Sequence, residues 1–285
     1  MNDGMGNKKI KIGVFSDVHG NFEALKAVMK KIKKLEPEKI IYLGDAIGYG
    51  ADPVKCWERI SAECDVVLKG NHEAMAVEEI DDSKCSELGQ ISSSWTKRQI
   101  EKRELDKMKG LPETFRFENM LFCHSGCTKS GKWKYYNESE NLVKEFADQN
   151  ANVIFTAHTH RPRIVITDKD NNIIYDRYIK KRKTIFHIDL SHYRVIVNTG
   201  SVGQQRDCRT DASFVILSVN ESMAEVRFSR IGYNRILAYL KIVYCGAGKK
   251  IANYLIREDW RRTLYENFAD RCKWIFGKIC KNSIK

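Results

Sequence analysis

The chain of 285 residues carries a formal net charge of +12, and 42% of its residues are hydrophobic and 30% charged. This composition is ordinary for a globular protein long enough to bury a sizeable core in one large domain, and no apolar run approaches the roughly 18 residues of a membrane span. Because the first residues also lack the apolar segment of a signal peptide, we expect a cytoplasmic protein whose nine cysteines are reduced thiols.

The first half of the chain alternates predicted strands and helices. Residues 9–16 (KIKIGVFS) are rich in β-branched and aromatic side chains, which suit a buried strand. Gly20 and Asn21 form a predicted turn, and residues 22–35 have the periodicity of an amphipathic helix. Further strands are predicted at residues 39–43, 65–68, 120–123 and 152–156.

Each of these five strands ends in polar residues that are able to bind metal ions. In chain order these residues are Asp17, His19, Asp45, Asn71, His72, His124, His158 and His160. Because α/β folds place their ligands at the carboxyl ends of strands, we expect the side chains to converge, although 143 positions separate the first from the last.

The types of side chain in this set point to a particular chemistry. Carboxylates, imidazoles and one amide oxygen suit Mn, Fe, Ni, Co or Zn as divalent ions, and they differ from the cysteine-rich ligands of a closed structural zinc site. Two such ions that share one carboxylate activate water and bind a phosphate for in-line attack. Each motif taken alone is more often an ordinary turn or a surface strand, so only the ordered set predicts this chemistry. We expect Cys123, beside His124, to pack as a small hydrophobic side chain.

Seven segments of the chain resemble sequence blocks of the calcineurin-like metallophosphoesterases, especially their compact bacterial and archaeal phosphodiesterase branch. The segments are SDVHGNFEALKAV, YLGDAIGYGADP, KGNHEA, WTKRQIEKRELDKMKGLPE, CHSG, TAHTHRP and NTGSVGQQRD, the last followed by ASFVIL. The resemblance covers about residues 9–235 and implies an α/β fold, a four-layer αββα sandwich of two mixed sheets. The chain has Ala157 where the family often has glycine and Thr199 where proline is commoner, and neither departure removes a ligand.

The resemblance also implies a role for each polar residue. The first metal ion would be held by Asp17, His19 and His160. The second would be held by Asn71, His124 and His158. Asp45 would bridge both ions, for which we expect Mn²⁺, and His72 would be the catalytic histidine. The implied reaction is the hydrolysis of a nucleotide or nucleic-acid phosphodiester by a metal-bridged hydroxide, with His72 protonating the leaving group or stabilising its charge.

The same ligands serve several reactions, so other functions stay open. A phosphomonoesterase or a Ser/Thr protein phosphatase would use the same centre. A non-catalytic interaction scaffold of the same fold is a third alternative. Family scaffolds of that kind lack the catalytic histidine, which is present here as His72.

A basic helical extension is predicted at residues 234–285, after a phosphoesterase domain at residues 1–233. The extension holds 12 Lys or Arg against 4 Asp or Glu, with aromatic residues interspersed. We expect it to pack on the core with its basic face in solvent. The alternatives are binding to nucleic acid or to an anionic membrane surface, or self-association. The apolar face that begins it is predicted to comprise Ile236, Leu240 and Val243.

Two polar segments in the second half of the chain are predicted to lie at turns. Residues 168–172 (DKDNN) are typical of a hairpin turn. The basic run at residues 180–183 either lies near the site or, as we expect, forms the edge of a hairpin, where lysines oppose unwanted strand pairing.

Overall fold

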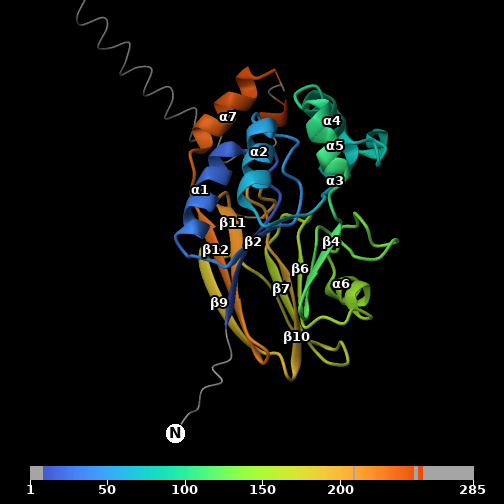
Figure 1. The fold of residues 1–285 in the computed structure, drawn as a ribbon, viewed down its shortest axis with the longest axis vertical. Coiled ribbons are helices and arrows are strands. Elements are labelled where there is room, and N and C mark those ends of the chain that lie inside the picture. The colour runs from blue at the N-terminus through green and yellow to red at the C-terminus, as the bar shows by residue number, and fades with distance from the viewer. Residues whose placement is uncertain (1–8, 208, 247–249, 253–285) are drawn as a thin grey trace, which may run out of the picture.

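Two six-stranded sheets pack face to face between layers of helices in the computed structural model, which describes residues 9–207, 209–246 and 250–252 (Figure 1). The first sheet has the order β3 (Val66–Val67), β2 (Lys39–Tyr42), β1 (Ile10–Phe15), β11 (Ala212–Val219), β12 (Met223–Ile231) and β9 (Lys183–Asp189). The second has the order β4 (Thr114–Phe117), β5 (Met120–Cys123), β6 (Val153–Thr156), β10 (Tyr193–Asn198), β7 (Arg163–Asp168) and β8 (Ile173–Tyr178). Both sheets mix parallel and antiparallel pairs.

Helices cover the outer faces of both sheets. The described helices are α1 (Phe22–Lys33), α2 (Pro53–Glu63), α3 (Asn71–Ala76), the 3₁₀ helix η1 (Asp82–Lys84), α4 (Glu87–Lys97), α5 (Lys102–Lys109), α6 (Ser139–Phe146) and α7 (Arg235–Tyr244). Helices α1 and α2 lie on the first sheet and α6 lies on the second (Figure 1). This arrangement confirms the predicted αββα sandwich.

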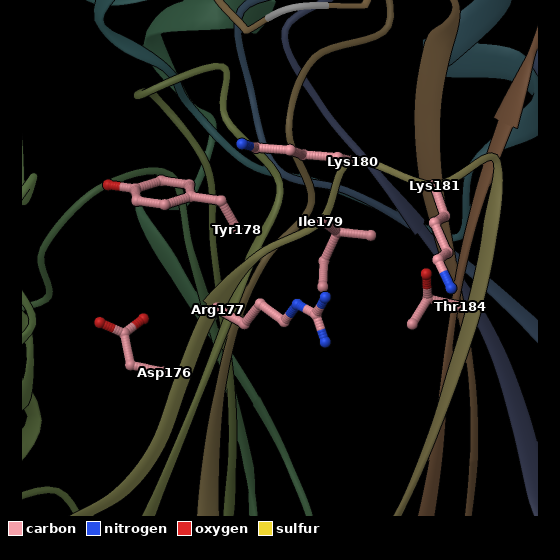
Figure 2. A pocket seen from close by; sticks show the side chains of 7 residues that line it. All are labelled: Asp176, Arg177, Tyr178, Ile179, Lys180, Lys181 and Thr184. Carbon is pink, nitrogen blue, oxygen red and sulfur yellow. The ribbon is translucent and has the colours of Figure 1, made fainter.

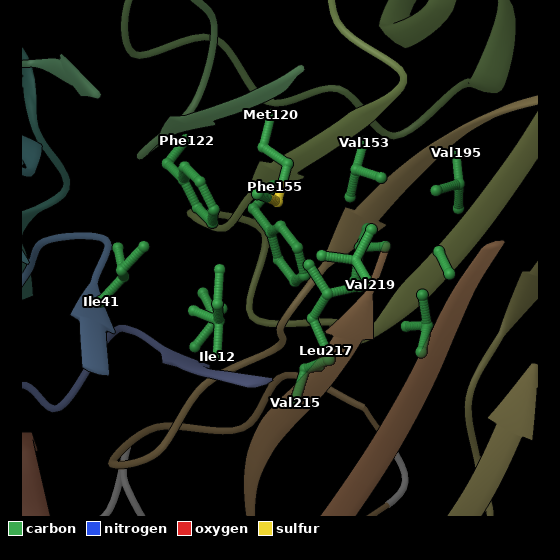
Figure 3. Close-up of a cluster of buried hydrophobic side chains, with 14 of the residues drawn as sticks. Ile12, Ile41, Met120, Phe122, Val153, Phe155, Val195, Val215, Leu217 and Val219 are labelled. Carbon is green, nitrogen blue, oxygen red and sulfur yellow. The ribbon is translucent and has the colours of Figure 1, made fainter. Parts of the chain in front are cut away.

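The space between the sheets is filled by aliphatic and aromatic side chains from both inner faces (Figure 3). Ile12 and Leu217 of the first sheet face Phe122 and Phe155 of the second, whose rings stack with centroids 5.3 Å apart. Because helices cover the opposite faces, β5, β6 and β11 are buried along their whole length. Their sequences are therefore continuous apolar runs rather than alternating ones.

The five predicted strands are all present. Strands β1, β2, β5 and β6 match their predicted limits to within one residue at each end. The third is shorter than predicted, since β3 contains two residues, but the flanking Asp65 and Leu68 still donate backbone N–H groups to Ile40 and Tyr42 at 2.9 Å each. Parallel pairing within β3–β2–β1 and within β5–β6 aligns their carboxyl ends.

Of the two polar segments, the first behaves as predicted and the second only in part. Residues 168–172 form the hairpin turn between β7 and β8, and Asp168 Oδ1 accepts the N–H groups of Asp170 and Asn172 at 2.9 Å each. Residues 180–183 are exposed and lie at a sheet edge, as expected, but they do not form a hairpin between β8 and β9. The segment leaves β8, at the edge of the second sheet, and enters β9, at the edge of the first, because these two edges adjoin and the chain crosses between them.

Helix α7 confirms that the extension begins as a helix, and its predicted apolar face is confirmed only in part, since Val243 packs against the cluster that contains Trp95. The helix buries Ala238 and Ile242, and Ile242 packs with Tyr49 and Trp95. Ile236, by contrast, is 41% exposed. Residues 247–249 and 253–285, which include most of the basic extension, lie outside the described residues. Among the described helices, none is long and apolar enough to cross a membrane.

Helix α7 is held to the core by Lys241, whose Nζ lies 2.8 Å from Glu23 Oε1 and 2.7 Å from Asp52 Oδ2. Because Glu23 is buried on α1, its carboxylate loses a close partner when Lys241 is replaced. We expect Lys241→Gln to lower the free energy of unfolding by about 1–2 kcal/mol in a urea titration. The exposed pair of Lys250 and Glu87 provides the control: Lys250→Gln should cost less than about 0.5 kcal/mol. Equal effects of the two variants would contradict this account.

Candidate metal and active site

The predicted metal-binding residues converge at the carboxyl ends of β1, β2, β3, β5 and β6. Within each of two groups, the nitrogen and oxygen atoms all lie within 4.8 Å of one another. The first group is Asp17, His19, Asp45 and His160, and the second is Asp45, His124 and His158. All six residues are buried. Asp45 belongs to both groups, which is the position that a bridging carboxylate would occupy.

The two remaining residues of the predicted set border these groups. Asn71 Oδ1 lies 3.2 Å from His124 Nε2, so the amide oxygen faces the second group. The backbone N–H of His72 donates to Asp45 Oδ1 at 2.9 Å. The His72 ring packs edge-on against His19, with centroids 4.7 Å apart, and also contacts Tyr49. The structure thus brings all eight predicted residues together.

Five of these residues hold a backbone conformation that is rare for residues with a side chain. Their φ angles are 52° at Asp17, 48° at His19, 64° at Asp45, 64° at His158 and 59° at His160. Left-handed conformations of this kind cost about 1–3 kcal/mol each and persist where the surrounding structure enforces them, commonly at functional sites. Here they turn successive side chains at the strand ends toward one cluster.

The loop after β10 is part of what enforces this geometry at Asp17. Ser201 Oγ and the N–H of Gly203 both donate to the backbone carbonyl of Asp17, at 2.8 and 2.9 Å. A β-carbon at position 203 would lie 1.8 Å from the carbonyl oxygen of Val18, so this close approach requires glycine. The turn that carries Asp17 and the loop after β10 are therefore held together by contacts between backbone atoms.

Glu73 is a buried residue beside the cluster that the sequence did not single out. Its buried carboxylate accepts the N–H groups of Asp45 (2.8 Å), Ala46 (2.7 Å) and Gly70 (2.8 Å). Burial and the nearby charge of Asp45 raise the pKa of Glu73 to about 7, against the lowering effect of these hydrogen bonds. Glu73 joins the turn after β2 to the start of α3. Its spacing of three residues from Gly70, typical of a capping box, was the available signal.

The two carboxylates of the cluster favour their charged forms. Burial opposes ionisation of Asp17, but the interactions with the neighbouring imidazoles of His160 and His124 outweigh it and hold the pKa of Asp17 well below its usual range. Burial likewise opposes ionisation of Asp45, and His124 and His72 lower its pKa. Ionised carboxylates are the form that binds cations.

Most imidazoles of the cluster favour the neutral form, which is also the metal-binding form. Burial lowers the pKa of His19 and of His160, and lowers that of His158 to about 3. His124 is the exception. Burial opposes its charge, but Asp45, with Oδ2 3.3 Å from His124 Nε2, raises its pKa to about 9. A metal ion at this nitrogen would take the place of the proton.

The donor set fits divalent cations. Asp17 Oδ1 is buried and accepts no hydrogen bond from the described residues, although His160 Nε2 lies 3.2 Å away. A buried, ionised oxygen without a donor is costly unless a cation satisfies it. Imidazole and carboxylate donors arranged around it are typical ligands of Mn, Fe, Ni, Co and Zn.

None of the cysteines within the described residues takes part in this cluster. Cys123 is buried with Leu121 and Phe146 beneath α6, and its Sγ lies 3.1 Å from the carbonyl oxygen of Ser125, which confirms that it packs as a small apolar side chain. The six cysteines within the described ranges are free thiols.

Known proteins share both the sequence and the fold. A family model described as the calcineurin-like phosphoesterase superfamily domain matches residues 10–222. An uncharacterized protein of Methanocaldococcus jannaschii is 32% identical over 244 residues, covering 82% of this chain and 93% of that protein.

Two crystal structures are similar over nearly their whole length. A metallophosphoesterase from Sphaerobacter thermophilus aligns with a TM-score of 0.72 and 25% identity, covering 86% of this chain and 98% of the other. A hypothetical protein from Pyrococcus horikoshii aligns with a TM-score of 0.63 and 13% identity, covering 87% and 98%, and at that identity the likeness concerns the fold. The family match, which spans most of the chain, confirms the resemblance found in the sequence. The chain belongs to the calcineurin-like phosphoesterase superfamily and is a metallophosphoesterase.

Proposed function

We propose that this protein hydrolyses phosphodiesters of nucleotide or nucleic-acid type with two divalent metal ions. The observation that carries the proposal is the position of Asp45, whose carboxylate belongs to both groups of metal-competent atoms. One carboxylate between two sets of imidazoles is the arrangement that places two cations close enough to act on one phosphate. Of the ions that the donors suit, we expect Mn²⁺, and we expect the protein to act in the cytoplasm.

Each residue of the cluster has a proposed part in this reaction. One ion would be held by Asp17, His19 and His160. The other would be held by Asn71, His124 and His158. Asp45 would join them, and when bound the two ions lower the pKa of water and neutralise the charge of the phosphate. His72 stands beside the cluster but outside both groups, so we assign it to the leaving group, which it would protonate or stabilise.

Two other functions remain as alternatives. A phosphomonoesterase or a Ser/Thr protein phosphatase would use the same cluster, and the choice depends on which substrate fits around it. A non-catalytic scaffold is disfavoured, because His72 and the full set of proposed ligands lie together. We also propose that residues 1–233 form the phosphoesterase domain and residues 234–285 an extension. The docking of α7 through Lys241 supports a packing role for the start of that extension.

The metal content of the purified protein tests the two-ion proposal. After removal of metals and dialysis against Mn²⁺, elemental analysis should find two Mn²⁺ per chain, and a crystal structure should place them about 3.5–4 Å apart on either side of Asp45. The loaded protein should then hydrolyse at least one substrate in a screen of cyclic nucleotides, dinucleotides, single-stranded nucleic acid and phosphopeptides. One ion per chain, or Asp45 turned away from the ions, would contradict the proposal.

A further inference from the structure

An exposed aromatic ring lies at the rim of the metal-competent cluster. Tyr135 is 53% exposed, and its ring stacks on that of His158 with centroids 4.1 Å apart and an interplanar angle of 28°. Arg206 lies over the same ring, with its Cζ 5.8 Å from the centroid, and its Nη1 is 3.3 Å from the Tyr135 hydroxyl. The backbone N–H of Arg206 bonds to the carbonyl of His160 at 3.4 Å. An aromatic surface and a guanidinium thus adjoin the cluster.

A second ring with a guanidinium partner follows along the surface. Tyr178, at the end of β8, is 37% exposed, and the Cζ of Arg163 lies 4.7 Å from its ring centroid. The Tyr178 hydroxyl donates to the carbonyl of Asn137 at 3.1 Å, and Arg163 Nη1 donates to the same oxygen at 2.7 Å. Because Asn137 is two residues from Tyr135, one loop connects both rings.

A basic pocket continues the surface beyond Tyr178. Its volume is about 460 Å³, and it lies where the chain passes from β8 to β9. In Figure 2, Arg177 and Lys181 point into the space between the two segments, and Lys180 extends on the same side as Tyr178. The pocket is joined to the cluster by backbone, since the N–H of Ile179 donates to the carbonyl of Pro162 at 2.8 Å, two residues after His160.

Four basic side chains between the cluster and the pocket are not neutralised by carboxylates of the described residues. Within the described part of the chain, no ion pair is formed by Arg161, Lys180, Lys181 or Arg209. Arg161 Nε bonds instead to the carbonyl of Arg206 at 3.1 Å, and Arg209 Nε to the carbonyl of Lys180 at 3.0 Å. These backbone bonds hold positive charge at the surface between the cluster and the pocket, where it is available to an anion.

We propose that this surface binds single-stranded nucleic acid, so that nucleotides next to the hydrolysed phosphate lie along it. The surface, called here the basic aromatic strip, comprises Tyr135, Arg161, Tyr178, Lys180, Lys181, Arg206 and Arg209. Unpaired bases can stack on exposed aromatic rings, and the backbone phosphates between them can pair with the neighbouring cations. The bases of a duplex are already stacked on each other and cannot stack on such rings. The proposal rests on the proposed phosphodiesterase function and names its substrate class.

Binding of a labelled oligonucleotide tests the strip without requiring catalysis. The full-length protein is titrated into 5′-fluorescein-labelled dT12 in EDTA, and the anisotropy gives Kd at several salt concentrations. In K180Q/K181Q we expect Kd to rise roughly 10- to 30-fold at 0.1 M salt and the salt slope to fall by about 1.4, since two phosphate contacts are lost. The control K30Q/K31Q removes the same charge from exposed lysines on α1 and should leave Kd within about twofold.

The two rings are tested in the same assay. Y135A and Y178A should each raise Kd about tenfold with little change in salt slope, because stacking on a base is lost and not a phosphate contact. Tyr193, which is 36% exposed at the start of β10, provides the matched control Y193A, with Kd expected to be unchanged.

Three results would overturn the proposal. The first is a K180Q/K181Q effect no larger than that of K30Q/K31Q, and the second is a pair of ring variants that behave like Y193A. The third is competition by a polyglutamate chain as strong as that by unlabelled dT12, which would indicate a surface for acidic peptides. Failure of the proposed function is recognised separately, because it appears as wild-type protein that binds dT12 in EDTA but hydrolyses no phosphodiester with Mn²⁺.

Discussion

Replacing Asp45 by asparagine is expected to lower kcat/KM for a phosphodiester by at least about 10³-fold and to reduce the bound Mn²⁺ below two ions per chain. The Oδ2 atom of Asp45 faces the Nε2 atoms of His19 and His124, at 3.7 and 3.3 Å. Asparagine keeps the size and one oxygen, which still accepts the N–H of His72. It removes the negative charge, and its NH₂ group has no lone pair for a second cation.

Two measurements separate this effect from a folding defect. Elemental analysis gives the metal content, and the thermal transition in EDTA reports the fold, which we expect to stay cooperative. The control Asp189→Asn makes the same chemical change at a residue that pairs with exposed His192, and it should bind two ions with wild-type activity. An Asp45→Asn protein that retained two ions and normal turnover would rule out the bridging role.

Replacing His72 by alanine is expected to separate chemistry from metal binding. Because His72 lies outside both groups of metal-competent atoms, the variant should still bind two Mn²⁺. Its kcat on a dinucleotide, whose alkoxide leaving group needs a proton, should fall by about 10²- to 10³-fold. On an aryl phosphodiester, whose leaving group is already stable as an anion, the loss should be less than about tenfold.

The comparison of the two substrates decides the role of His72. An equal loss on both would mean that the ring positions its neighbours His19 and Tyr49, which it contacts, and does not serve the leaving group. No loss on the dinucleotide would contradict the proposed role directly. His192→Ala, at an exposed histidine, is the matched control and should behave as wild type with both substrates.

The strands and the polar residues that end them were predictable because both signals are local. A run such as residues 120–123 is apolar throughout since it is buried on both faces, and His124 follows it directly. The shared position of Asp45 was expected only through the resemblance to a family, because nothing in the residues near it indicates which side chains it meets.

What the sequence did not reveal depends on contacts between distant segments. Gly203 contacts Val18, which lies 185 positions earlier in the chain, and no local sequence pattern indicates such a contact. Helix α7 buries Ala238 and Ile242 and leaves Ile236 exposed, and its contact with Glu23 of α1 through Lys241 joins residues that lie 218 positions apart. The crossing at residues 180–183 follows from how the two sheet edges meet, which the pattern of charges in that segment does not encode.

The close approach of Gly203 to Val18 also limits how the enzyme can change in evolution. Any side chain at position 203 would collide with the backbone of Val18. The backbone of the turn that carries Asp17 therefore cannot change gradually through single substitutions at this position. Tyr135 and Lys180 are exposed, so we expect changes of size and charge there to leave the main chain in place. Laboratory selection for activity on a new phosphoester substrate should therefore accumulate substitutions around these rim positions. The metal-binding residues and the reaction would stay the same while the substrate preference changes.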